Sequence, residues 1–374
     1  MQSAAIIKNN AKRAELSALT GIRFLAAFLV FIFHVQLQIG TPYLKFRIDN
    51  IVSQGALGVT LFFVLSGFLL TYSHLKDFNE KKIPSKAYYR KFIIKRLARV
   101  YPAYIVGLLL FALVSVIFES YPTNFFSTAL LDVFMVQSFF PALEMAWYGG
   151  GGWSVSVELF FYLLFPFVLP LLLRIQKKET LLLLLSALII LSSVPGVLHN
   201  LFSGVIKDQH IHVYAFAPLR FPEFLCGIIT GIFVFQFDWR ISGNIAGLLL
   251  LVLAAYLMII GGKLHEYTVH NIVALPAIMS LMCLCGQGRV PSAMQWLNSS
   301  VMQYLGKISY CFYIIQLPLL FIISILRAKH LVTENDQLLA PLFLVTDIAL
   351  AAFLFHFVEG PSHSWILKRF VKKE

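Results

Sequence analysis

Charged side chains are scarce in this chain of 374 residues: Asp, Glu, Lys and Arg together make up 13% of it. A soluble domain carries about twice that fraction, so the composition excludes one or several ordinary soluble domains. Hydrophobic residues make up 59% of the chain. They fall into repeated blocks of roughly 18 to 22, which is the length of helix that spans a bilayer. The sequence therefore predicts an all-α, polytopic integral membrane protein.

Cysteine is rare as well, and each of its four copies lies within an apolar block: Cys226, Cys283, Cys285 and Cys311. We interpret them as packing residues, because this placement predicts neither a disulfide framework nor a metal site. The sequence also lacks the inverted internal repeat that is typical of transporters. No soluble domain is expected at either end. Residues 1–374 are therefore expected to form a single membrane-embedded domain, with residues 360–374 as a cytoplasmic tail.

The net charge of +12 could indicate nucleic-acid binding, but the positions of the basic residues favour another explanation. They cluster between the apolar blocks, which is the signal of membrane topology. Basic residues precede the first block, fill the loop KDFNEKKIPSKAYYRKFIIKRLAR, follow the fourth span as RIQKK and end the chain as SWILKRFVKKE. We therefore expect a lipid bilayer rather than nucleic acid as partner. Both termini should be cytoplasmic, in a multi-pass protein of the bacterial cytoplasmic membrane.

About ten spans satisfy every basic loop with both ends inside. They are expected at about 18–38, 55–75, 100–119, 153–173, 180–198, 216–236, 244–261, 271–286, 308–327 and 339–358. The segment 125–145 is mostly apolar, but it is short and contains several polar residues. Only one crossing fits between the third span and RIQKK, so this segment is expected to be a re-entrant or surface helix that walls a cavity.

The first span, GIRFLAAFLVFIFHV over residues 21–35, carries Arg23 and His34 among apolar residues. Eleven residues at ~100° each amount to three turns plus ~20°, so both side chains project from one face, ~16 Å apart along the axis. Two interpretations are open. In the first, Arg23 extends to lipid headgroups while His34 bonds a neighbouring helix. Alternatively, the pair forms a polar track from the cytoplasmic face to a buried base that accepts a proton near pH 7.

Six segments, in order, resemble the integral-membrane acyltransferases of family 3. The first is the Arg-x10-His pattern of Arg23 and His34. The others are GVTLFFVLSGFLLTY, KRLARVYPAY, GGWSVSVELFFYLLFP, LRFPEFLCGIITG, and LGKISYCFYIIQLP with the closing FVEGP. One such motif would be weak evidence, whereas six in the family's order are strong. The residues that carry these motifs are Arg96, Arg99, Pro102, Trp153, Ser154, Glu158, Arg220 and Glu223.

Two departures from the family's pattern matter. Many relatives have His where this chain has Gln316, and an amide cannot shuttle protons. Many relatives also append an extracytoplasmic esterase-like domain, whereas this chain is expected to resemble the stand-alone branch. That branch acylates sugars, lipids and secondary metabolites, macrolides included. The resemblance implies a membrane O-acyltransferase that moves an acyl group, by default acetyl, from acyl-coenzyme A to a hydroxyl of a glycan or polysaccharide precursor, a lipid or a small metabolite.

Acyl transfer from a thioester to a hydroxyl needs a base and positive or hydrogen-bonding groups near the thioester oxygen. We expect His34 as the base, with Arg23 and Glu158 as the other catalytic residues. Glu158 either orients His34 or pairs with an arginine on another span. No metal and no tightly bound cofactor is expected, and acyl-coenzyme A acts as co-substrate.

A polyanionic donor made in the cytoplasm needs basic contacts on that side. Arg96 and Arg99 are expected to supply them with Arg90 and Lys95 nearby, although these residues could simply follow the positive-inside rule. Trp153, Ser154, Arg220 and Glu223 belong either to the site or to the scaffold, where Arg220 and Glu223 would satisfy each other. The run Gly149–Gly152 is expected to be a flexible loop break, because it lacks the residues of a phosphate-binding loop.

Two other functions remain open on the sequence alone. A transporter or flippase of a polar lipid or metabolite would explain buried charges, but not the ordered motifs. A catalytically inactive membrane scaffold or receptor is the third alternative.

Overall fold

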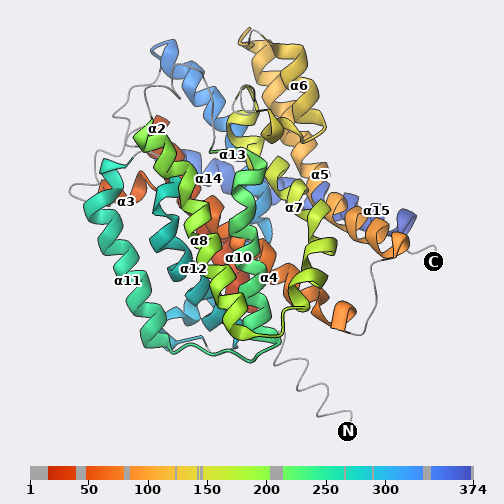
Figure 1. Ribbon diagram of the computed structural model, residues 1–374. Coiled ribbons are helices and arrows are strands. Elements are labelled where there is room, and N and C mark those ends of the chain that lie inside the picture. Colours follow the sequence, from red (N-terminus) through yellow and green to blue (C-terminus); the bar gives the residue numbers. More distant parts are fainter. Residues whose placement is uncertain are drawn as a thin grey trace.

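A computed structural model describes residues 16–38, 48–79, 85–122, 124–140, 143, 146–202, 214–264, 267–288, 290–331 and 338–371 (Figure 1). These residues are mostly helical, and no strand occurs among them. The expected all-α membrane architecture is therefore confirmed for the part of the chain that is described.

Ten helical segments among the described residues are long and apolar enough to cross a membrane, which confirms the expected number. They contain α2 (Ser17–Gln38), α4 (Leu57–Asn79), α5 (Lys86–Ile117), α7 (Gly149–Leu173), α8 (Lys178–Leu201), α10 (Ala217–Phe235), α11 (Gly243–Ile260), α12 (Asn271–Gly286), α13 (Ser300–Ala328) and α14 (Leu339–Leu354). The last of the ten segments begins with α14 and continues through a π-helical turn, η5 (Phe355–Glu359), into α15 (Gly360–Phe370). Shorter elements connect the long helices: α3 (Ile48–Val52), η2 (Gly261–Lys263), η3 (Tyr267–His270) and η4 (Ser292–Asn298).

The segment 125–145 is not among the ten spans, which agrees with the expectation that it does not cross the bilayer. It forms α6 (Phe125–Val133) and η1 (Gln137–Phe139), and residues 141, 142, 144 and 145 lie outside the described part. Nine residues of helix are far too few to span a membrane. The buried hydroxyl of Tyr104 donates to the carbonyl of Asp132 at 2.8 Å, which ties α6 to α5.

The third span begins earlier than its hydropathy indicates. A start near residue 100 was expected, but α5 begins at Lys86, after Ser85 caps it by accepting a hydrogen bond from the backbone N–H of Tyr88 at 3.1 Å. The basic residues before Pro102 are therefore helical. Their charge hides the helix from a hydropathy window, although nothing in this stretch breaks the backbone pattern.

The prediction of a loop break at Gly149–Gly152 is wrong, because these glycines form the first turn of α7. A Cβ on Gly151 would lie 2.1 Å from Cδ2 of Leu317, and one on Gly152 would lie 3.0 Å from the ring of Tyr148. The absence of side chains lets α13 and the Tyr148 ring approach the start of α7. The glycines therefore serve close packing rather than flexibility.

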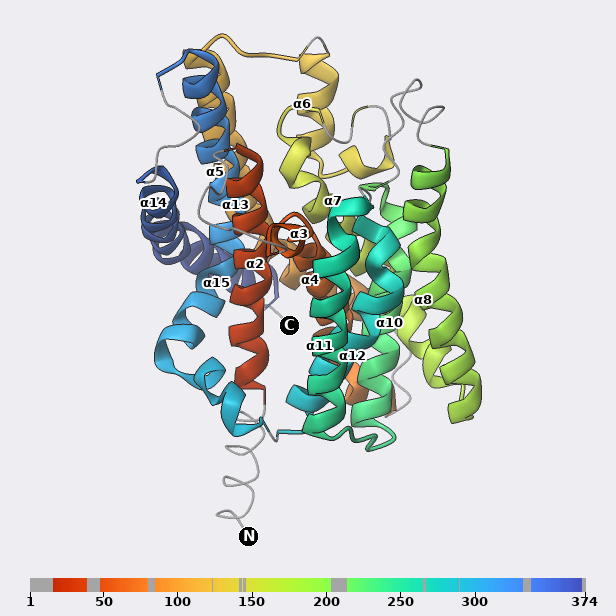
Figure 2. The ribbon, with the colours of Figure 1, turned by 90° about the vertical axis from the view of Figure 1, so that its left-hand side faces the viewer.

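Glycines also set the closest helix pair of the bundle, α4 with α10. A Cβ on Gly227 would lie 2.0 Å from the carbonyl oxygen of Val64, and one on Gly67 would lie 2.3 Å from that of Phe224. Close approach through small residues is the usual means of helix association in membranes, because burial from lipid gives no hydrophobic gain. The same device joins α13 to α2, where a Cβ on Gly306 would lie 2.0 Å from the carbonyl oxygen of Thr20. Figure 2 shows α2 and α13 side by side.

This contact predicts that Gly227→Ala destabilises the protein by about 1–3 kcal/mol, because α10 must move away from α4 to admit the methyl group. Thermal unfolding of detergent-solubilised protein, followed by loss of the monodisperse peak, measures the effect. The matched control is Gly247→Ala on α11, where no atom lies within 4 Å of the added Cβ. The control should be neutral or slightly stabilising, since Ala has the higher helix propensity. Equal effects of both variants would contradict the packing argument.

Candidate functional site

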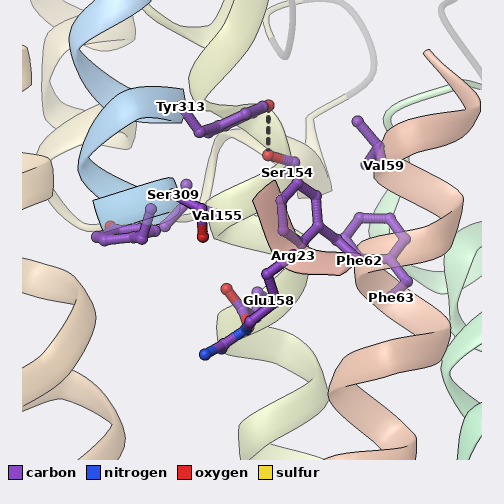
Figure 3. Close-up of a pocket in the computed structure, with 10 residues that line it drawn as sticks. Arg23, Val59, Phe62, Phe63, Ser154, Val155, Glu158, Ser309 and Tyr313 are labelled. Atoms are coloured by element: carbon purple, nitrogen blue, oxygen red, sulfur yellow. Dashed lines mark hydrogen bonds between the residues drawn. The ribbon is translucent and has the colours of Figure 1, made fainter. Parts of the chain in front are cut away.

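A cavity between α2, α4, α7 and α13 brings together residues from four spans (Figure 3). Its volume is about 70 Å³, several times the ~10–15 Å³ that a single water needs on the same measure. Two charged side chains line it, Arg23 of α2 and Glu158 of α7, and four hydroxyls join them, those of Ser154, Ser309, Tyr310 and Tyr313. Val59, Phe62, Phe63 and Val155 form the apolar part of the wall. The structure thus brings two of the three expected catalytic residues to one cavity.

Arg23 belongs to a larger cluster of charged side chains, most of which are half-buried. Arg99 of α5, Glu158 and Glu359 of η5 all act electrostatically on it. Arg96, one turn before Arg99, also interacts with Arg99 and Glu158. Three arginines therefore meet two carboxylates. This arginine cluster (Arg23, Arg96, Arg99, Glu158 and Glu359) holds one more positive than negative charge.

Glu158 has further partners that fix its side chain. The hydroxyl of Ser66 donates to Oε1 of Glu158 at 3.4 Å, and the hydroxyl of Tyr162 donates to the same oxygen. Of the two roles expected for Glu158, these contacts and its interaction with Arg23 favour the pairing with an arginine of another span. The electrostatic influences on His34 do not include Glu158.

The hydroxyls of the cavity form a directed chain. Tyr313 donates its single hydroxyl proton to the carbonyl oxygen of Gly151 at 2.8 Å. The Ser154 hydroxyl, 2.7 Å from that of Tyr313, must then be the donor in the second bond. The chain of bonds runs from Ser154 through Tyr313 to Gly151. It joins the first two turns of α7 to α13 and leaves lone pairs of the Ser154 oxygen free to accept a bond from a ligand.

His34 lies elsewhere on α2 and does not line this cavity. Its ring is half-buried, and Nδ1 lies 3.4 Å from Oε1 of Gln316 on α13. Arg23 and His34 do share one helix, eleven residues and ~16 Å apart along its axis, as the sequence predicts. The contact between His34 and Gln316 was not expected, because an amide cannot shuttle protons and the sequence therefore predicted no catalytic role for Gln316.

The four basic residues expected to bind the donor divide into two pairs on α5. Arg96 and Arg99 are half-buried and face the interior, whereas Arg90 and Lys95 are exposed. Arg96 donates to Nε2 of His74 at 3.2 Å and lies over the rings of Phe92 and Tyr162. Because guanidinium only donates, His74 Nε2 carries a lone pair, and its Nδ1 faces the Tyr88 hydroxyl at 2.9 Å.

Arg220 and Glu223 form a separate buried group. Their side chains lie 3.0 Å apart and are each 1% exposed. Asn271 donates to Glu223 Oε1 at 2.6 Å, and Arg220 donates to Thr60 at 3.2 Å. Arg220 also lies over three rings, those of Tyr214, Phe63 and Trp153, with the nearest centroid 4.7 Å away. These contacts join α4, α7, α10 and α12, and Trp153 lies next to the cavity residue Ser154 on α7.

Several residues of the site escaped the sequence argument: Glu359, Tyr162, Tyr313 and His74. Glu359 lies one residue beyond the expected last span, within the quoted FVEGP, so the rule for charges inside spans did not single it out. The tyrosines and His74 give no such signal, because their importance depends on which spans meet.

Within the described residues, no group of three His, Cys, Asp or Glu side chains is placed to hold a metal ion.

Comparison with known proteins identifies relatives over most of the chain. A family model described as an acyltransferase domain, the third such family, matches residues 16–357. An acyltransferase of Streptomyces mycarofaciens, MdmB, is 27% identical over 321 residues, covering 80% of this chain and 78% of its own. A Staphylococcus aureus protein named "Putative O-acetyltransferase" is 24% identical over 384 residues, covering 94% of this chain but only 58% of its own length. No solved structure matches the chain.

The electrostatic interaction of Arg23 with Glu158 predicts a coupling energy of about 1–3 kcal/mol in a double-mutant cycle of Arg23→Gln and Glu158→Gln. Glu158→Gln raises the excess positive charge of the arginine cluster from one to two, whereas adding Arg23→Gln returns that excess to one. Denaturant unfolding in micelles measures the cycle. Asp238 and Arg240, an exposed pair 3.0 Å apart, provide the control cycle, which should give only about 0.2–1 kcal/mol. A coupling at Arg23–Glu158 no larger than the control would show that the two charges do not depend on each other.

Proposed function

The chain belongs to the acyltransferase 3 family and is a multi-pass membrane acyltransferase, and we propose that it moves an acyl group from acyl-coenzyme A to a hydroxyl of its acceptor. The expected acyl group is acetyl, in keeping with the name of the staphylococcal relative. The acceptor is a glycan or polysaccharide precursor, a lipid or a small metabolite. The coenzyme is a co-substrate and leaves after each transfer.

The proposal rests on the distance between the arginine cluster and His34. Arg23 of this cluster and His34 project from one face of α2. The arginine cluster has an excess positive charge, which favours an anionic ligand. His34 lies ~16 Å further along α2 from Arg23. Coenzyme A has the matching form, because a long flexible arm separates its phosphates from the thioester. Its phosphates would bind at Arg96 and Arg99 while its thioester reaches His34.

The donor would enter from the cytoplasm, where acyl-coenzyme A is made. Exposed Arg90 and Lys95 lie nearer the start of α5 than Arg96 and Arg99, and would attract the phosphates first. This direction of entry requires the start of α5 on the cytoplasmic side, with both chain termini on that side too. It agrees with the basic loop before α5 and the positive-inside rule.

The reaction assigns His34 the role of general base. As the acceptor hydroxyl oxygen attacks the thioester carbon, the imidazole takes the hydroxyl proton, and the new C–O bond forms. The C–S bond then breaks, and the departing thiolate takes the proton back from the imidazolium. Arg23 and Glu158, with the Ser154 hydroxyl, would position the donor's arm in the cavity. A transient acyl-imidazole on His34 is the competing mechanism.

Loss of His34 should abolish transfer without loss of donor binding. His34→Ala and His34→Gln should both reduce the rate ~10²–10⁴-fold, since glutamine can form hydrogen bonds but cannot take the proton. Transfer from labelled acetyl-coenzyme A in isolated membranes measures the rate, and retention of the donor on purified protein measures binding. Near-normal transfer by His34→Gln would make the histidine structural. Label trapped on His34 in the absence of acceptor would favour the acyl-imidazole over direct transfer.

The arginines of α5 should act on the donor and not on the acceptor. Arg96→Ala and Arg99→Ala should each raise the KM for acyl-coenzyme A by about tenfold or more, because each removes a charge-assisted phosphate contact. The KM for the acceptor should change little. Arg174→Ala is the control, since Arg174 is an exposed arginine that follows another span. Donor KM values unchanged in both α5 variants would overturn the placement of the phosphates.

A further inference from the structure

The side chain of Gln316 lies between α13 and α2, completely buried, with His34 at one end and the backbone of α13 at the other. The two helices are among the most closely packed of the bundle, because Gly306 lets α13 approach the backbone of α2. A buried amide has four hydrogen-bonding sites to satisfy. Its contacts therefore determine which way it points.

The amide nitrogen of Gln316 donates to the carbonyl oxygen of Tyr313 at 3.0 Å. A carbonyl can only accept, so this bond fixes the nitrogen at the α13 end and turns the amide oxygen toward His34. The amide oxygen in turn can only accept. The 3.4 Å contact between Oε1 and His34 Nδ1 therefore requires the imidazole proton on Nδ1. The lone pair of the neutral ring is then on Nε2.

The partner of His34 is neutral, which separates this arrangement from a carboxylate–histidine pair. Burial and the Gln316 contact are the influences on His34 among the described groups. Charged side chains on the elements packed against α2 do not act on it: Asp49 of α3, Lys76 and Asp77 of α4, and Lys307 and Arg327 of α13. The amide thus sets the position of the ring proton without adding a charge to the membrane interior.

We propose that Gln316 is a positioning residue of the transfer reaction, which holds the proton of His34 on Nδ1 so that Nε2 faces the acceptor hydroxyl as the base. The inference rests on the proposed function, in which His34 takes that proton. Gln316 itself exchanges no proton. Its contribution is to keep the ring in one tautomer and one orientation, and Tyr313, through its carbonyl, keeps the amide itself from turning.

The ring proton can be located directly by nitrogen NMR of protein labelled with ¹⁵N-histidine. The His34 signal is assigned as the one that disappears in His34→Gln. In the wild type it should report a protonated Nδ1 and a bare Nε2. In Gln316→Leu, which has similar size and no acceptor, the preference should be lost and both tautomers should be populated. A wild-type ring that carries its proton on Nε2 overturns the proposal whatever the activity of the variants.

Kinetics provide the second readout. Gln316→Leu should lower kcat by about 10- to 100-fold with an unchanged donor KM, because the base is present but wrongly protonated in part of the molecules. Gln316→Glu loses the bond to Tyr313 but keeps an acceptor and adds a charge that stabilises the imidazolium. Its acidic limb in the pH profile of kcat/KM should therefore move to higher pH by at least about one unit.

The outcomes separate this inference from the function on which it rests. If His34→Gln abolishes transfer while Gln316→Leu retains the wild-type kcat and Gln316→Glu the wild-type pH profile, Gln316 is only a packing residue and the role of His34 stands. If His34→Gln remains active, the base assignment fails first. Should Gln316→Leu not fold, the wild-type tautomer and the profile of Gln316→Glu still decide the question.

Discussion

The structure depends on one constraint: a charge placed between apolar helices must be compensated within the protein, because lipid offers no solvation. Two groups of charged side chains respond to this constraint in different ways. Arg220 and Glu223 neutralise each other on α10 and bind α4 and α12 through Thr60 and Asn271. The arginine cluster is compensated only in part, and it draws its members from α2, α5, α7 and η5. The first group leaves no net charge. The second retains a charge with which a ligand can interact, and this is the difference expected between a structural pair and a binding site.

Most of the fold could be predicted from the sequence, because the cost of placing a residue in lipid acts largely residue by residue. The ten spans and the non-crossing segment around α6 followed from apolar block length and loop charge. Two of the errors concerned features that depend on neighbours. The start of α5 at Lys86 rests on a cap and on continued helical geometry, which charge conceals from a hydropathy window. The helical state of Gly149–Gly152 depends on the close approach of Leu317 and Tyr148, which no local pattern contains.

The sequence predicted those residues of the site that stand out individually as charges in apolar segments. Arg23 and Glu158 stood out as charges in apolar segments, and the structure brings them to one cavity. Which residues pair could not be predicted, because pairing depends on how spans far apart in sequence come together. Glu158 belongs with Arg23 and Tyr162, and His34 contacts Gln316, 282 positions later. Gln316 was not expected in the site, because only proton transfer was considered and an amide cannot transfer protons.

The π-helical turn at Phe355–Glu359 restricts how this chain can change in length. A single π turn in an α-helix is equivalent to one inserted residue, which the helix absorbs as a bulge. Deleting one residue from this turn would restore α geometry and leave α14 and α15 in nearly their present orientation, because the bulge absorbs the extra residue. Glu359, which ends the turn, accepts a hydrogen bond from the thiol of Cys311 at 3.0 Å. A gapless alignment through the last span with a sequence that lacks the bulge would therefore match the wrong residues on one side of it.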